Sequence, residues 1–153
     1  KAITQGQIAD ILMARGKLEA ALALHDQRLS IAQQLGDMES IAHIKFSTAQ
    51  IRFQRGDRRT SGIQQIYEDL AEAFEISRKL SHPDAIGAIG QLLAQVLAMS
   101  GRKRDALAVL DQAEAAYNKL GNVQGLEQVR QLRGMVAGVN NPTAKAGGFE
   151  PPT

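Results

Sequence analysis

The residues that could do chemistry in this chain are few and do not converge on one centre. Three histidines occur, His25, His43 and His82, and helical ligand spacing joins only Glu39 to His43. Two ligands without a third do not make a metal site. The chain has no cysteine, which excludes disulfides, thiolate catalysis and cysteine-ligated zinc. The sequence therefore predicts no metal, no cofactor and no enzyme.

Carboxylates at helical spacing are the other groups that could act as acids or bases. Glu68 precedes Glu72 by one turn, and Asp111 precedes Glu114 by nearly one turn. No neighbouring residue in the sequence is arranged to activate these groups, as a catalytic carboxylate would require. We expect both pairs to lie on solvated helix faces.

The elements that position these residues are predicted to be helices. Strong helix formers dominate the chain, and three of its four prolines follow residue 140. Apolar-periodic runs end at glycines, where a residue that tolerates positive φ is favoured, or at Ser81-His82-Pro83. The closing glycines are Gly16, Gly36, Gly56, Gly101 and Gly121. The predicted helices are 4–15, 18–35, 38–55, 61–80, 84–100, 103–120 and 123–137. Gly87 and Gly90 fall inside one of them, where close packing is expected.

Small residues recur at equivalent places along these helices. Ala49 and Ala94 each follow by fourteen residues a leucine that ends the preceding run, and Ala21 matches Ala106 in the second helix of a hairpin. Small side chains let paired helices approach closely. The chain therefore reads as a series of repeated helical hairpins.

These hairpins resemble tetratricopeptide repeats. The resemblance is carried in the first hairpin by Ile8, Ala9, Leu12, Gly16 and Ala21, and in the third by Leu93, Ala94, Leu97, Gly101 and Ala106. The period of about 40 residues exceeds the usual 34 and resembles the extended repeats of kinesin light chains and of sensor arms on signalling ATPases. Arg52 departs from the pattern, because Leu12 and Leu97 stand at the matching places.

The resemblance implies an all-α fold, a right-handed superhelix (solenoid) of about three and a half hairpins. The expected parts are a repeat domain over 1–138, with hairpins at about 3–36, 38–81 and 84–121 and a capping helix at 123–138, and a flexible tail or linker over 139–153. In such a solenoid the last helix covers the open face of the preceding hairpin.

The resemblance also implies a concave groove lined by the first helix of each hairpin. Its candidate residues are Asp10, Met13, His43, Phe46, Gln50, Phe53, Gln91, Gln95, Met99, Gln128, Gln131 and Met135. A row of side-chain amides can both donate to and accept from an extended peptide backbone. The alternative is that glutamine serves only as a solvated helix former, and that the Phe and Met side chains belong to the core.

Basic residues gather at the turns within hairpins, where stacking would form a basic rim. The candidates are Arg15, Lys17, Arg55, Arg58, Arg59, Arg102, Lys103 and Arg104. Such a rim would steer an acidic partner segment and raise its association rate. The alternative is that these charges only solvate the turns.

The leading interpretation is a non-catalytic protein- or peptide-binding scaffold, the interaction or sensor part of a larger protein. A self-associating, homo-oligomeric module is the alternative. RNA binding by helical repeats is a third reading, against which stand the irregular period, 4% aromatic residues and a net charge of +2. A cytoplasmic location is expected, without a membrane span, because the most apolar stretch, 85–99, is too short.

Overall fold

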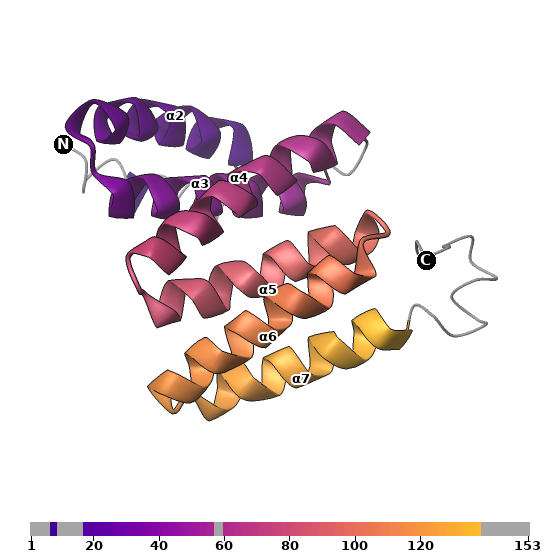
Figure 1. Cartoon of the computed structure of the whole chain (residues 1–153). Helices are drawn as coiled ribbons and strands as arrows, with labels where there is room; N and C mark the ends of the chain where they lie inside the picture. Colours follow the sequence, from indigo (N-terminus) through magenta and orange to yellow (C-terminus); the bar gives the residue numbers. More distant parts are fainter. Residues whose placement is uncertain (1–6, 9–16, 57–59, 139–153) are drawn as a thin grey trace. The chain divides into compact units, whose positions relative to one another are not determined.

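The computed structural model describes residues 7–8, 17–56 and 60–138 (Figure 1). Within these ranges every regular element is an α-helix and no strand occurs. The elements are α2 (Leu18–Leu35), α3 (Met38–Arg55), α4 (Thr60–Lys79), α5 (Pro83–Met99), α6 (Lys103–Leu120) and α7 (Val123–Gly138). The all-α prediction is therefore confirmed.

Helix boundaries agree closely with those predicted from the glycine and proline signals. Helices α2, α3 and α6 begin and end at the predicted residues. Helices α4 and α5 each lie one residue earlier than predicted, and α7 ends one residue later. Of the predicted first helix only Gln7 and Ile8 are described, and both are helical, whereas the predicted tail lies outside the described residues.

The conformation at the helix ends shows why the helix boundaries could be predicted from the sequence. Gly36 ends α2 with φ 67, and its backbone N–H donates to the carbonyl of Gln33 at 3.2 Å. Ser81 takes the same left-handed region, with φ 56, between α4 and the proline that opens α5. At helix starts, Asp37 accepts a hydrogen bond from the Ser40 backbone N–H at 3.1 Å. Its hydrogen bonds with Ser40, above all that from the hydroxyl, lower the pKa of Asp37.

The chain divides into two compact units, Lys1–Ile76 (the N-terminal unit) and Ser77–Thr153 (the C-terminal unit). In the N-terminal unit α2 packs on α3. Ala21, Leu22 and Ile51 form a buried cluster at this contact, with Leu18 and Leu24 packed against it.

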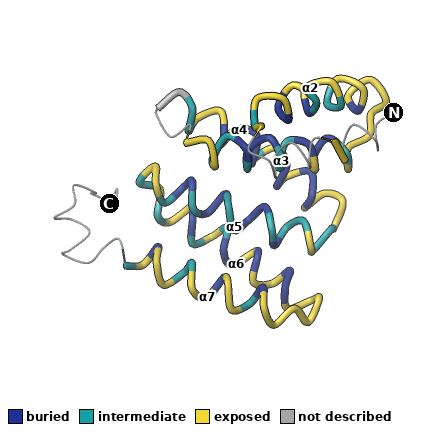
Figure 2. Tube along the Cα trace, turned by 180° about the vertical axis from the view of Figure 1, so that it is seen from behind, coloured by how far each residue is buried: buried dark blue, intermediate teal, exposed yellow. Residues whose placement is uncertain are grey.

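In the C-terminal unit, helices α5, α6 and α7 all contact one another. Helices α5 and α7 run in the same direction and α6 runs in the opposite one (Figure 1). Helix α5 carries more buried residues than its two neighbours, while α7 keeps much of its length exposed (Figure 2). Ile89 and Val96 of α5, Leu110 of α6 and Val129 of α7 are among the large side chains buried in this unit.

The phenol ring of Tyr117 in α6 occupies space that two glycines leave free. A Cβ added at Gly87 of α5 or at Gly125 of α7 would lie 2.4 Å from a ring carbon of Tyr117. No real Cβ makes such a contact, so a glycine is required on either side of the ring. The close packing predicted for Gly87 is thereby confirmed.

The repeated alanines are buried as the sequence predicted. Ala21, Ala49, Ala94 and Ala106 are each 0% exposed. Gly134 of α7 follows Leu120 by fourteen residues, the same spacing that defines Ala49 and Ala94. It is instead exposed, and a Cβ added there would meet nothing within 4 Å. The described chain places no helix against that face of α7.

The first prediction concerns the space beside the Tyr117 ring. We expect Gly125→Ala to lower the free energy of unfolding by about 1–3 kcal/mol, because the new methyl group overlaps with the Cγ and Cδ1 atoms of the Tyr117 ring. Gly134→Ala in the same helix is the matched control. It should leave stability unchanged or raise it by up to about 1 kcal/mol, because alanine has the higher helix propensity. Equal effects of the two substitutions in chemical denaturation would contradict the packing described.

Candidate functional site

The structure brings predicted site residues together on α5 and α7, within the C-terminal unit. The side-chain Nε2 of Gln91 donates to Oε1 of Gln128 at 2.9 Å. The same nitrogen donates to the hydroxyl of Tyr117 at 2.7 Å. Two residues that the sequence assigned to separate helices of a groove are therefore in direct contact.

The remaining two glutamines extend this pair along both helices. Gln95 follows Gln91 by one turn on α5, and Gln131 follows Gln128 by nearly one turn on α7. Helices α5 and α7 are in contact and run in the same direction (Figure 1). The helical spacing therefore places these side chains along the same surface. We call Gln91, Gln95, Gln128 and Gln131 the glutamine strip.

The Gln91–Gln128 contact leaves hydrogen-bonding groups unused. Both Nε2 hydrogens of Gln91 are engaged, whereas its Oε1 acceptor has no partner among the described residues. The Nε2 group of Gln128, an exposed residue, likewise keeps its donors. The side-chain oxygen of Gln91 and the side-chain nitrogen of Gln128 are therefore available for further hydrogen bonds.

Tyr117 is the member of this site that the sequence analysis missed. Its ring is buried between Gly87 and Gly125, and its hydroxyl reaches Gln91. The sequence does contain a signal for this contact, because Gly87 and Gly125 lie inside helices, where glycine indicates that a neighbouring helix packs closely. Which side chain fills the space between them depends on how the three helices pack.

Two predicted methionines lie on the same helix faces as the glutamine strip. Met99 follows Gln95 by one turn on α5 and is 45% exposed. Met135 follows Gln131 by one turn on α7 and is 66% exposed. Both are accessible rather than core residues, so the surface combines amides with flexible apolar side chains.

The other groove candidates belong to the N-terminal unit or are not described. On α3, His43 is exposed, whereas Phe46, Gln50 and Phe53 are half-buried. Asp10 and Met13 lie outside the described residues. Half-burial of the two phenylalanines fits either a groove wall or the margin of the core.

The basic residues at the turns are only partly described. Arg15, Arg58 and Arg59 lie outside the described ranges, while Lys17, Arg55, Arg102 and Arg104 are exposed and Lys103 is half-buried. Arg55 forms an ion pair with Glu19 at 2.6 Å, and Arg102 forms one with Asp105 at 2.8 Å. Glu19 therefore places a negative charge beside one of these turns.

A buried carboxylate in the N-terminal unit explains the unusual Arg52. Asp69 of α4 is 6% exposed, and its oxygens lie 3.0 Å from Arg52 Nη1 and 3.6 Å from Lys45 Nζ of α3. Burial raises the pKa of Asp69, and the two cations and the Gln65 amide oppose that shift without overcoming it. Arg52 thus replaces an apolar residue because it pairs with this carboxylate.

The acidic pairs lie on exposed helix faces, as the sequence predicted, and three of the four carboxylates form ion pairs there. Glu72 forms an ion pair with Lys45 at 3.2 Å. Asp111 and Glu114 of α6 both pair with Arg133 of α7, each at 2.7 Å. Their spacing on α6 serves this contact between helices.

In the described part of the chain, no group of three metal-ligating side chains comes together. His25 is buried in α2, 3.4 Å from the guanidinium of Arg28, and His43 is exposed on α3. No described helix is both long and apolar enough to cross a bilayer.

A scan against protein-family models and a search of the curated proteins find no match to this chain.

The second prediction concerns the Asp69 carboxyl. Its midpoint in an NMR titration should lie above the 3.8 of an ordinary aspartate, because burial disfavours the charged form. Since the folded-state pKa exceeds the unfolded one, the Asp69 contribution to stability is largest below pH 3.8 and falls as pH rises through the folded pKa. Arg52→Gln should raise the midpoint further by removing a favourable charge. A midpoint that Arg52→Gln lowers or leaves unchanged would contradict this account.

Proposed function

We propose that this chain is a non-catalytic scaffold that binds a protein or peptide along the glutamine strip. It is built from tetratricopeptide-like hairpins with a period of about 40 residues, stacked as a right-handed superhelix of about three and a half hairpins. In this proposal the chain is the interaction or sensor part of a larger protein. The hydrogen-bonded pair Gln91–Gln128, with its unused acceptor and donor, is the observation that carries it.

The repeat interpretation draws support from burial at equivalent positions. Ala49 and Ala94 occupy matching places in α3 and α5, and Ala21 and Ala106 occupy matching places in α2 and α6. All four side chains are fully buried. Equal burial at equivalent positions is expected when successive hairpins pack against their neighbours in the same way.

The chemistry of the strip suits an extended peptide. Each peptide unit offers one N–H donor and one C=O acceptor. Gln91 Oε1 is free to accept and Gln128 Nε2 to donate, so the pair matches one backbone unit. The buried ring of Tyr117 fixes Gln91 through its hydroxyl, which lowers the entropy lost when a ligand binds. Met99 and Met135 add adaptable apolar contact at one end of the strip.

The stacking can be measured in solution. Small-angle X-ray scattering should give a maximum dimension larger than that of a compact sphere of 153 residues, because hairpins added side by side elongate the molecule. A scattering profile of a compact sphere would contradict the superhelix.

The third prediction tests the strip with peptides selected from a random phage-displayed library against the whole chain. For a selected peptide, the double substitution Gln95→Ala and Gln131→Ala should weaken binding by about 1–3 kcal/mol in calorimetry, because two hydrogen-bonding amides are lost. These two residues are chosen because neither holds Tyr117. The melting temperature should change little.

Gln33→Ala, an exposed substitution on α2, is the matched control and should leave the affinity unchanged. Amide chemical shifts on peptide addition should change along α5 and α7. The strip would be refuted as the binding surface by two results together. The double substitution would leave the peptide affinity unchanged, and the chemical-shift changes would lie outside α5 and α7.

A further inference from the structure

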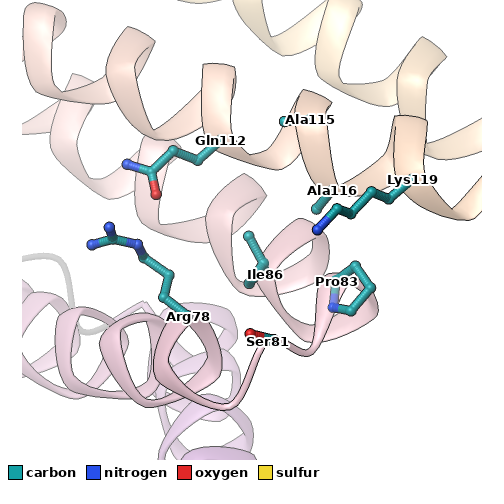
Figure 3. A pocket seen from close by; sticks show the side chains of 8 residues that line it. All are labelled: Arg78, Ser81, Pro83, Ile86, Gln112, Ala115, Ala116 and Lys119. Carbon is teal, nitrogen blue, oxygen red and sulfur yellow. The ribbon is translucent and has the colours of Figure 1, made fainter.

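A separate hollow of about 300 Å³ lies in the C-terminal unit (Figure 3). The end of α4, the turn after it, the start of α5 and the second half of α6 form its walls. None of its lining residues belongs to the glutamine strip. Its volume is at the small end of the range for ligand pockets in proteins.

The rim of this hollow carries positive charge from two different helices. Arg78 extends from the last turn of α4, and Lys119 reaches over the hollow from the last turn of α6 (Figure 3). Lys119 forms no ion pair with any described residue. No acidic side chain lines the hollow, so its two ionised groups share one sign. Ser81 and Gln112 add a hydroxyl and an amide that can donate hydrogen bonds.

The floor of the hollow is apolar. Ala116 is buried, and Pro83 and Ile86 of the first turn of α5 are half-buried. Ala115 contributes a methyl group beside them. The small size of the two alanines creates the space between α6 and the start of α5. A ligand that fits must therefore place an apolar body on this floor and an anionic group at the rim.

We propose that this hollow binds a small organic anion, with one carboxylate or phosphate group on a short aliphatic body. Arg78 already takes part in an interaction within the chain, and the remaining N–H groups of its guanidinium can donate to the anionic group. The ammonium of Lys119 adds a second charge from the opposite wall. The aliphatic body contacts Ile86 and Ala116. This site goes beyond the proposed peptide binding, because it uses other residues and another class of ligand.

The charge and the apolar floor are tested separately by NMR titration of the whole chain with three small probes at constant ionic strength. Butyrate should shift the backbone amide signals of Ser81, Ala116 and Lys119. Acetate should bind more weakly, by about fourfold for each buried methylene that it lacks. Butyramide, which has the shape of butyrate without its charge, should cause no saturable shift. Equal binding of butyrate and butyramide would overturn the proposal.

Inorganic phosphate distinguishes the two anionic groups. Displacement of butyrate by an equal concentration of phosphate would assign the site to phosphate-bearing ligands, and retention of butyrate would assign it to carboxylates. Both results support an anion site. Shifts that spread equally over basic residues outside the hollow would instead show non-specific ion binding and overturn it.

Substitutions at the rim complete the test. Arg78→Gln and Lys119→Gln should each weaken butyrate binding about three- to tenfold, the range expected for partly exposed charge-assisted hydrogen bonds. Lys79→Gln is the matched control, because Lys79 adjoins Arg78 in the same helical turn but does not line the hollow. It should change the affinity less than twofold.

Arg78 and Lys119 also offset the negative ends of their helices, so the melting temperature of each variant is measured alongside. The site would be refuted if the double variant Arg78→Gln, Lys119→Gln bound butyrate as tightly as the unsubstituted chain.

Discussion

The C-terminal unit depends on one steric constraint, the phenol ring of Tyr117 held between two glycines. Gly87 and Gly125 supply no Cβ, so α5 and α7 both approach the ring that α6 places between them. Interior packing tolerates neither a void nor an overlap at such a place. The ring therefore fixes the distance between three helices at once, and its hydroxyl positions Gln91 for its contact with Gln128. Packing and the candidate site share the same side chain.

Several charged residues of this molecule form ion pairs between neighbouring helices. Arg133 of α7 reaches two carboxylates of α6, and Asp69 of α4 faces two cations of α3. The Asp69 contact is made at low exposure, where desolvation costs energy that the ion pairs only partly offset.

The two candidate binding surfaces of the C-terminal unit differ in chemistry. The glutamine strip offers paired neutral donors and acceptors, which match the alternating groups of a peptide backbone. The hollow beside Arg78 and Lys119 offers positive charge above an apolar floor, which matches a compact anion. Helix α5 contributes to both surfaces through different faces, with Gln91 on one and Ile86 on the other. A ligand at either surface therefore contacts the same helix.

The sequence by itself determined the helices, because their limits are set locally. Left-handed glycines, the Ser81-His82-Pro83 stop and the apolar periodicity depend on neighbours within a few residues, and they placed the ends of the described helices within one residue. Burial of the repeated alanines and close packing at Gly87 were also predictable, since small residues inside amphipathic helices have few other uses. Only the tertiary structure decided which partners meet. The Tyr117 ring, the ion pairs of Arg52 and Arg133, and the hollow at Lys119 each join residues that are distant in sequence. Such contacts depend on how whole helices pack, and helical periodicity specifies a face but not the side chain that lies opposite it.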